Sequence, residues 1–408
     1  MVKGRWAYNW VQILAHHYGK SVVVFGALWL LALGGLFQSL ALFEQMNFMW
    51  VGLALALMGA VAVKVMDSVK AGVLLFGLSL AVLGAVLGLL GWFGLALSET
   101  SVLGMVVVLA LMMSNLVHVM AALLREMARG GFQHDALAEA LNMNAAPILL
   151  SNLTTGLGFG VAAFYDPRLM DAAWIVVLGA AVSYAMLMTA LPLILLRWFL
   201  EFRVGHYEDR HGFIGLAEKF QAYPKWVTLM LWLSALLVVM SLVYLARKLD
   251  NLSAVGVMLA TSFVVLLVFW HDLKITLMTL LNSVLSVILV LTAYFSVQNL
   301  QAISAVILIV PLGIVLDDAI HYFARYLKSK RGYFNDVESC HRFALASVGR
   351  PIWATTQILI AGLLVLSFSE NTLVQQASLI TLLAVLLASY IVLVWLPALG
   401  LKKAKNNR

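Results

Sequence analysis

The sequence predicts an all-α, multi-pass membrane protein whose twelve transmembrane helices form two parallel six-helix repeats. Of the 408 residues, 63% are hydrophobic and 11% are charged, and the mean hydropathy is +0.99. A soluble domain carries about 25% charged residues, so this composition excludes the water-soluble class. The distribution of the basic residues and an internal sequence repeat support the same fold class.

Twelve apolar segments have about the ~20 residues that a helix needs to cross a bilayer. The first follows an aromatic and basic stretch at residues 1–20. It is too long for the apolar core of a cleavable signal peptide, so we expect a signal anchor. The single cysteine, Cys340, falls in an expected polar loop and excludes an intrachain disulfide. The expected spans are 21–42, 47–65, 71–97, 102–124, 146–165, 171–197, 225–246, 252–270, 274–297, 302–326, 350–369 and 373–400.

The basic residues indicate how these spans are oriented. With the N-terminus in the cytoplasm, 23 of the 26 lysines and arginines fall on the cytoplasmic side, and Arg168, Arg247 and Lys248 fall outside. This asymmetry follows the positive-inside rule. We therefore expect a bacterial inner (cytoplasmic) membrane protein with both termini in the cytoplasm. The net charge of +7 then reflects topology and contact with anionic membrane lipids, and no nucleic acid partner is expected.

An internal repeat relates the two halves of the chain. An offset of 203 residues aligns a histidine with a histidine and polar pairs with polar pairs, and the offset becomes 204 for the last of these pairs. The matching positions are His118 with His321, Ser114-Asn115 with Asp317-Asp318, and Ser151-Asn152 with Thr355-Thr356. Since six spans is an even number, both halves have the same orientation and are related by an axis along the membrane normal.

The repeat predicts the domain organisation. We expect a first six-helix repeat at residues 1–200, a cytoplasmic linker at 201–224 and a second repeat at 225–408. Each half carries an amphipathic segment between its fourth and fifth spans, at residues 125–141 and 329–345. Basic residues beside Phe and Leu are typical of helices that lie in the membrane interface, so we expect that placement for both segments.

Two adjacent carboxylates, Asp317 and Asp318, lie inside an apolar span. An ionised side chain at the bilayer centre costs at least about 2.5–3.5 kcal/mol, and such residues usually mark ion or proton paths. His321 follows on the same helix face, and Arg325 lies one further turn along. We expect the coupled carboxylates to take up and release protons, with His321 in the same relay. The alternative is a hydrogen-bonded polar pair that only fixes helix packing.

The matching face of the fourth span carries Ser114, Asn115 and His118. If the two repeats face each other, these side chains lie across from the aspartates and belong to the same proton relay. For His118 alone, a buried core histidine is the alternative. Serines and threonines in spans often bond their own helix, but as a set we expect further polar side chains to extend the path. These supporting residues are Ser151, Asn152, Thr355, Thr356 and, as a weaker candidate, Asn282.

Other motifs are absent from the sequence. There is no GxxxxGK[ST] phosphate-binding loop, so ATP is not the expected energy source. No Cys/His cluster has zinc spacing and no GxSxG elbow occurs. We therefore expect neither a metal nor another cofactor, and no enzyme activity. An intramembrane hydrolase that uses His, Asp and Ser is the alternative.

The segments GIVLDDAIHYFARY and GRPIWATTQILIAGLLVLSF and the closing LPALG resemble the second-half signature of the resistance–nodulation–division (RND) superfamily. They are most similar to the MMPL/hydrophobe-exporter branch, which is related to Patched-type and sterol-sensing proteins. LMMSNLVHVM, APILLSNLTTGLGFG and LPLILL form a weaker equivalent in the first half. The resemblance covers essentially the whole chain. It implies the RND transmembrane-domain fold and export of hydrophobic or lipid-like molecules driven by the proton motive force, with Asp317 and Asp318 as proton relay.

The chain departs from that family in two respects. The carboxylates that the family carries on its fourth span are replaced by Ser114 and Asn115, so half of the relay is missing. The large extracytoplasmic domains are also missing, because about four residues (FEQM) join spans 1 and 2 and about five (KLDNL) join spans 7 and 8. We therefore expect a transporter core that works with membrane lipids and a separate periplasmic partner protein. The alternatives are a non-transporting lipid- or sterol-binding scaffold subunit, and an exporter shortened by design that folds without transporting.

Overall fold

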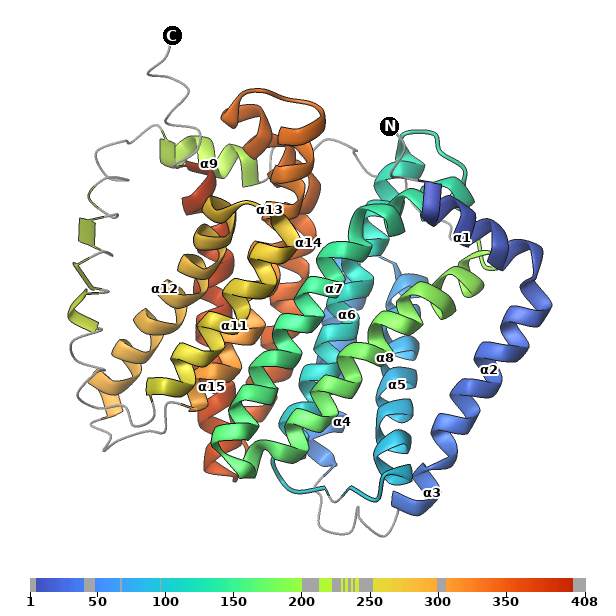
Figure 1. Cartoon of the computed structure of the whole chain (residues 1–408), viewed down its shortest axis with the longest axis horizontal. Helices are drawn as coiled ribbons and strands as arrows, with labels where there is room; N and C mark the ends of the chain where they lie inside the picture. The colour runs from blue at the N-terminus through green and yellow to red at the C-terminus, as the bar shows by residue number, and fades with distance from the viewer. Residues whose placement is uncertain are drawn as a thin grey trace.

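The computed structural model is a bundle of long α-helices that run side by side, with their ends at two opposite faces (Figure 1). One face carries α1 (Arg5–His16) and α9 (Phe213–Gln221), and we call it the N-terminal face. The opposite face carries short connections such as residues 97–100 and 367–371, and we call it the loop face. The structure describes residues 5–39, 48–66, 68–95, 97–199, 213–221, 229, 232–233, 236–237, 239–241, 252–298 and 306–398.

The helices of the first half begin with the short amphipathic α1 and end with the sixth expected span. In chain order they are α2 (Tyr18–Gly34), α3 (Leu36–Ser39), α4 (Met49–Met66), α5 (Val69–Trp92), α6 (Ser101–Ala128), α7 (Gln133–Tyr165), the 3₁₀ turn η2 (Pro167–Leu169) and α8 (Met170–Leu195). After α9, the second half contains α11 (Leu252–Trp270), α12 (Leu273–Gln298), α13 (Val306–Gly332), α14 (Val337–Leu366), α15 (Thr372–Tyr390) and a π-helical turn, η3 (Ile391–Trp395).

Among the described residues, 11 helical segments are long and apolar enough to cross a membrane. They match eleven of the twelve expected spans, and most of the remaining one, residues 225–246, lies outside the described part. The expected all-α, multi-pass membrane architecture is confirmed. The division at residues 200 and 225 stays a prediction.

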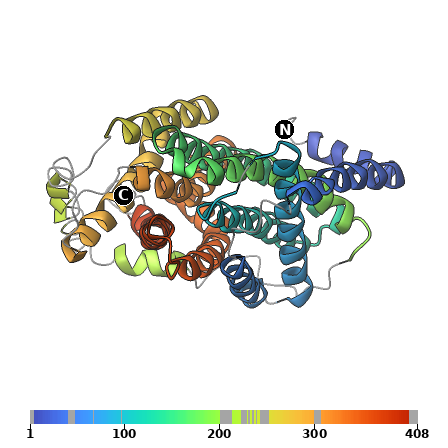
Figure 2. The ribbon, with the colours of Figure 1, turned by 90° about the horizontal axis from the view of Figure 1, so that it is seen from below.

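The helix bounds follow the sequence repeat. The helices α11, α12, α13, α14 and α15 begin 202–205 residues after α4, α5, α6, α7 and α8. The packing is also paired: α13 lies against α7 and α14 against α6, while α14 contacts α4 and α11 contacts α7. Each half thus inserts its fourth and fifth spans against those of the other half. Seen from below, α6, α7, α13 and α14 form the centre of the molecule (Figure 2).

Two glycines allow a close crossing between the halves. A Cβ added to Gly158 on α7 would lie 3.1 Å from the Cα of Gly313 on α13, and one added to Gly313 would lie 3.2 Å from the Cα of Gly158. Small residues at such crossings let two backbones approach in a membrane, where dispersion contacts drive helix association. This contact holds α13 close enough to α7 for short polar side chains to meet between them.

The two amphipathic segments do not form separate interfacial helices, which corrects the expectation from sequence. The first part of each extends α6 or α13, and the second part is the beginning of α7 or α14, which continue through Pro147 and Pro351. The physical reason is packing: Leu137 and Leu141 are buried in the protein rather than facing lipid. Cys340, expected in a polar loop, is likewise buried in the first turn of α14.

Candidate functional site

The two aspartates lie midway along α13, where it meets the central helices of both halves. Asp318 is buried, and the side chain of Asp317 is 18% exposed. The helix α13 is a continuous apolar helix around them, because Pro311 lies near its first turn and leaves the later turns intact. The pair therefore lies on a rigid element inside the protein.

Among the described residues, the carboxylate oxygens of Asp317 accept hydrogen bonds only from the first half of the chain. The Ser114 hydroxyl on α6 donates to Oδ2 at 3.0 Å, and the Ser151 hydroxyl on α7 donates to Oδ1 at 2.5 Å. Both serines are residues that the sequence singled out, and the structure brings them to the carboxylate. Asp317 therefore links the two repeats.

Asp318 is bonded within its own repeat. The Ser389 hydroxyl on α15 donates to its Oδ2, and Ser389 is 2.7 Å from the Thr356 hydroxyl on α14. Thr356 also donates to the carbonyl of Ile352 at 2.7 Å, as membrane threonines commonly do. Sequence reasoning missed Ser389, a lone serine in an apolar run. The π-helical turn η3 begins two residues later, and π-turns often mark functional sites.

The first repeat contains a neutral counterpart of this arrangement. Asn115, which occupies the position equivalent to Asp318, donates to the side-chain oxygen of Asn152 at 3.1 Å. Asn152 in turn donates to the carbonyl of Ala180 on α8 at 2.9 Å. The expectation was that Asn115 partners the aspartates; the structure instead pairs it with its own repeat. The amide nitrogen of Asn115 is thus bonded to Asn152, and that of Asn152 to the backbone, without any ionisable group.

The two repeat-related histidines meet where the halves join. The rings of His118 and His321 stack with centroids 3.6 Å apart and planes inclined by 3°. The Nε2 of His321 lies 3.5 Å from the Asp317 Oδ1, so the carboxylate and the imidazole are neighbours along α13. The structure thus places His118 beside His321 rather than directly beside an aspartate.

A cavity of about 40 Å³, measured as the space open to the centre of a water molecule, adjoins the carboxylates. One water needs roughly 10–15 Å³ by that measure, so the cavity has room for a few. On α6 its lining includes Val107 and Leu111, which precede Ser114 on the side of the loop face. The cavity therefore approaches the aspartates from the loop face, and the histidines lie on the side of the N-terminal face.

The remaining supporting residues differ in their placement. Thr355 lines the cavity, and its hydroxyl donates back to the carbonyl of Ile352 at 2.9 Å. Asn282 on α12 is buried, does not line the cavity, and has no side-chain hydrogen bond among the described residues. The structure thus brings Thr355 to the site and does not bring Asn282 there.

Toward the N-terminal face, long cationic side chains cross between the two halves. Arg325 on α13 donates to the Asn144 side-chain oxygen on α7 at 2.7 Å, and Lys328 reaches Glu139 at 3.4 Å. In the opposite direction, Arg125 on α6 donates to backbone carbonyls of α14, including that of Ser347 at 2.9 Å. These contacts hold the fourth span of each half to the fifth span of the other.

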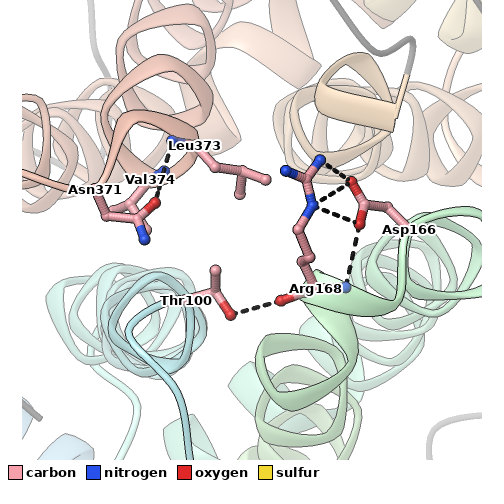
Figure 3. A network of polar contacts seen from close by, with 6 residues as sticks. All are labelled: Thr100, Asp166, Arg168, Asn371, Leu373 and Val374. Carbon is pink, nitrogen blue, oxygen red and sulfur yellow. Dashed lines mark hydrogen bonds and ion pairs between the residues drawn. The ribbon is translucent and has the colours of Figure 1, made fainter. Parts of the chain in front are cut away.

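At the loop face, polar contacts order the turns (Figure 3). Thr100 donates to the carbonyl of Arg168 at 2.7 Å, and Asn371 caps the first turn of α15. The guanidinium of Arg168 donates to both oxygens of Asp166, the shortest contact being 2.6 Å. These hydrogen bonds hold the pKa of Asp166 below its usual range.

Comparison with known proteins identifies solved structures that share this fold. No protein family and no curated protein matches the chain in sequence. Among solved structures, it is similar to SecDF, a translocon-associated membrane protein from Thermus thermophilus, with 15% identity and a TM-score of 0.70. It is similar to SecDF in a super-membrane-facing form with 14% identity and a TM-score of 0.69. Each match covers 88% of this chain and 62% of the other.

The similarity shows that this chain shares the helical membrane fold of these SecDF structures. It does not support the MMPL or Patched branch in particular. Because the chain spans less than two thirds of the length of these structures, their whole-protein activities and partners are not carried over with the fold.

Proposed function

We propose that this chain is the membrane core of an RND-type transporter driven by the proton motive force, with Asp317 and Asp318 as the protonation site. The observation that carries the proposal is the different bonding of the two carboxylates. Asp317 is held by serines of the other repeat, and Asp318 by Ser389 of its own. A proton added to this pair therefore acts on the contact between the two halves.

The hydrogen-bond chemistry explains the coupling. As a carboxylate, Asp317 can only accept, and it receives the hydroxyl hydrogens of Ser114 and Ser151. Once protonated, one carboxyl oxygen becomes a donor and a weaker acceptor, so the serine hydroxyl bonded to that oxygen is held less strongly or reverses its role. The contact between α13 and the helices α6 and α7 then differs between the two protonation states, so the contact has two alternative arrangements.

The proposed cargo is a hydrophobic or lipid-like molecule that enters laterally from the bilayer. The short connections expected between spans 1 and 2 and between spans 7 and 8 support work with a separate periplasmic partner. The SecDF structure is described as translocon-associated, which supports a role for this fold beside another membrane complex. We place the protein in a bacterial inner membrane with cytoplasmic termini, and we propose no enzymatic reaction.

A non-transporting scaffold that binds lipid is the second candidate. It is favoured by Asn115 and Asn152, which form a neutral pair at positions where a two-sided relay would need ionisable groups. Such a scaffold needs no change of protonation at Asp317 and Asp318. Proton movement is therefore the measurement that separates the two candidates.

The test is proton flux in sealed proteoliposomes under an imposed pH gradient. We expect the double variant Asp317→Asn with Asp318→Asn to lose at least tenfold in flux, because the amides cannot exchange a proton and still fill the same space. Asn282→Ala, away from the cavity, is the matched control for a change at a buried polar side chain. Equal flux in the parent and the double variant would contradict the proposal and favour the scaffold.

A further inference from the structure

Two buried histidines lie about one turn from the aspartates, on the side of the N-terminal face. His118 on α6 is 2% exposed and His321 on α13 is 1% exposed. Their rings stack face to face at 3.6 Å, at equivalent positions of the two repeats. The stack therefore lies on the contact between the two halves.

The hydrogen-bonding state of the rings is unusual. Among the described residues, none of the four ring nitrogens has a hydrogen-bond partner. Buried polar side chains are nearly always bonded, and a single orphan atom already costs stability. Phenylalanine would fill the same space without that cost. What an imidazole adds is a ring nitrogen that can accept a proton and release it again.

Charged groups act on the stack from both directions along α13. Asp317 lies toward the loop face and Arg325 toward the N-terminal face. Arg125 of α6 and Glu139 of α7 act on Arg325 from still nearer that face. The helix α14 has no ionisable side chain between Arg350, which is exposed, and its end. Among the described residues, the carboxylate within 4 Å of a ring nitrogen of the stack is that of Asp317.

We propose that the His118–His321 stack is a single-proton station between Asp317 and the N-terminal face, in which His321 carries the proton and His118 supports it. This inference rests on the proposed proton-driven function. His321 is assigned the carrier role because its Nε2 lies 3.5 Å from the Asp317 Oδ1. His118 supports it because the face of a neutral ring attracts a stacked cation.

The stacking distance limits the station to one proton. Two imidazolium charges 3.6 Å apart in a buried site repel each other strongly, so one ring must stay neutral. A station that holds one proton passes protons between Asp317 and the N-terminal face one at a time. A second proton could enter only if the rings separated, which would separate the two halves at the same place.

The transfer step conserves protons and electron pairs. The O–H bond of protonated Asp317 breaks, and the lone pair on Nε2 of neutral His321 forms a new N–H bond, leaving a carboxylate and an imidazolium. The imidazolium then releases the proton on Nδ1, which is buried in this structure, to a water molecule that must reach the ring from the side of the N-terminal face. The carboxylate accepts again from Ser114 and Ser151, and the ring returns to its first tautomer before the next transfer.

Two phenylalanine variants separate carrier from support. His321→Phe and His118→Phe each keep an aromatic ring in the stack but remove a different imidazole. In the proteoliposome assay we expect His321→Phe to lower proton flux at least tenfold, and His118→Phe to keep several times more flux than His321→Phe. Equal losses in the two variants, or parental flux in His321→Phe, would overturn the proposal, because a purely structural stack treats both rings alike.

A spectroscopic readout tests single occupancy independently of flux. In protein labelled with ¹⁵N at histidine and held in lipid nanodiscs, each ring is assigned by the signal that its phenylalanine variant lacks. We expect no pH at which both rings show imidazolium signals while the protein is folded, and simultaneous signals would overturn the proposal. Size-exclusion profiles and thermal unfolding confirm that both variants fold.

The outcomes distinguish this inference from the proposed function. If the double aspartate variant conducts protons like the parent, the proposed function fails and the station fails with it. If the double aspartate variant is inactive while His321→Phe conducts fully, the proposed function stands and only the station is overturned.

Discussion

Asp317 and Asp318 are adjacent in sequence, yet their carboxylates belong to different contacts. Neighbouring residues on a helix point about 100° apart, so one side chain faces the first repeat and the other faces α15. Both aspartates line the cavity, but Asp317 accepts hydrogen bonds from serines of the other half, whereas Asp318 accepts one from Ser389 of its own half. At the scale of single residues, this difference in direction assigns Asp317 to the contact between the halves and Asp318 to its own half.

A second carboxylate, Asp166 at the loop face, supplies a prediction on pH. Its folded-state pKa is held below the usual value by hydrogen bonds from Arg168, so the unfolded chain binds the proton more readily. The resulting stabilisation is fully present above the unfolded pKa of about 3.9 and is lost as the pH falls through the folded pKa. We expect Asp166→Asn to cost about 0.5–1 kcal/mol at pH 7 and nothing at strongly acid pH.

Unfolding of the purified protein in detergent at neutral and at acid pH measures this difference. Arg168→Gln should show the same loss, and combining it with Asp166→Asn should add little, because both remove one contact. A penalty for Asp166→Asn that is unchanged between the two pH values would contradict the assignment to the ion pair.

At the scale of elements, the crossing of α7 and α13 positions the site. The backbones meet at Gly158 and Gly313, and Ser151 lies two helical turns before Gly158 on α7. Ser151 can reach Asp317 at 2.5 Å because this crossing is close. A larger residue at the crossing would move the serine away from the carboxylate.

We therefore expect Gly158→Val to lower the free energy of unfolding by about 1–3 kcal/mol and to reduce proton flux. Gly160→Val is the matched control, since a Cβ at Gly160 on the same helix meets nothing within 4 Å. Thermal unfolding and the proteoliposome assay measure the two effects. If both variants behave alike, the close crossing does not position the site.

Some features of individual helices were predictable from the sequence, and others were not. The span of α13 and the shared face of Asp317 and His321 were predictable, because apolar length and helical period are local properties. The continuity of α7 through Pro147 was not predicted, because burial of Leu137 and Leu141 by the rest of the protein decided it. Ser389 was missed because its partner lies 71 residues earlier and only packing brings them together.

At the scale of the whole molecule, the repeat and the basic residues predict one orientation in the membrane. The turn between α6 and α7 should face the cytoplasm and the turn between α14 and α15 the periplasm. Arg129 and Glu370 are exposed positions in these two turns. Arg129→Cys and Glu370→Cys, each made in a Cys340→Ala background, place a single thiol at opposite faces.

We expect a membrane-impermeant maleimide added to intact cells to label Glu370→Cys after the outer membrane is permeabilised. Arg129→Cys should react only after the inner membrane is opened. The background Cys340→Ala is the control for unspecific labelling. Labelling of Arg129→Cys in intact inner membranes, with Glu370→Cys protected, would show the opposite topology.

The sequence by itself determined the membrane class, eleven spans that the structure describes, the internal repeat, and the anomaly of two carboxylates in an apolar span. Hydropathy, charge asymmetry and internal repetition are local or statistical properties of the chain, so they can be read without coordinates. Only the tertiary structure decided which partner each polar residue takes: Asp317 with Ser114 and Ser151, Asn115 with Asn152, and His118 stacked on His321. Hydrogen bonds and ring contacts act over about 3–4 Å, so they depend on how the helices cross rather than on their order in the chain.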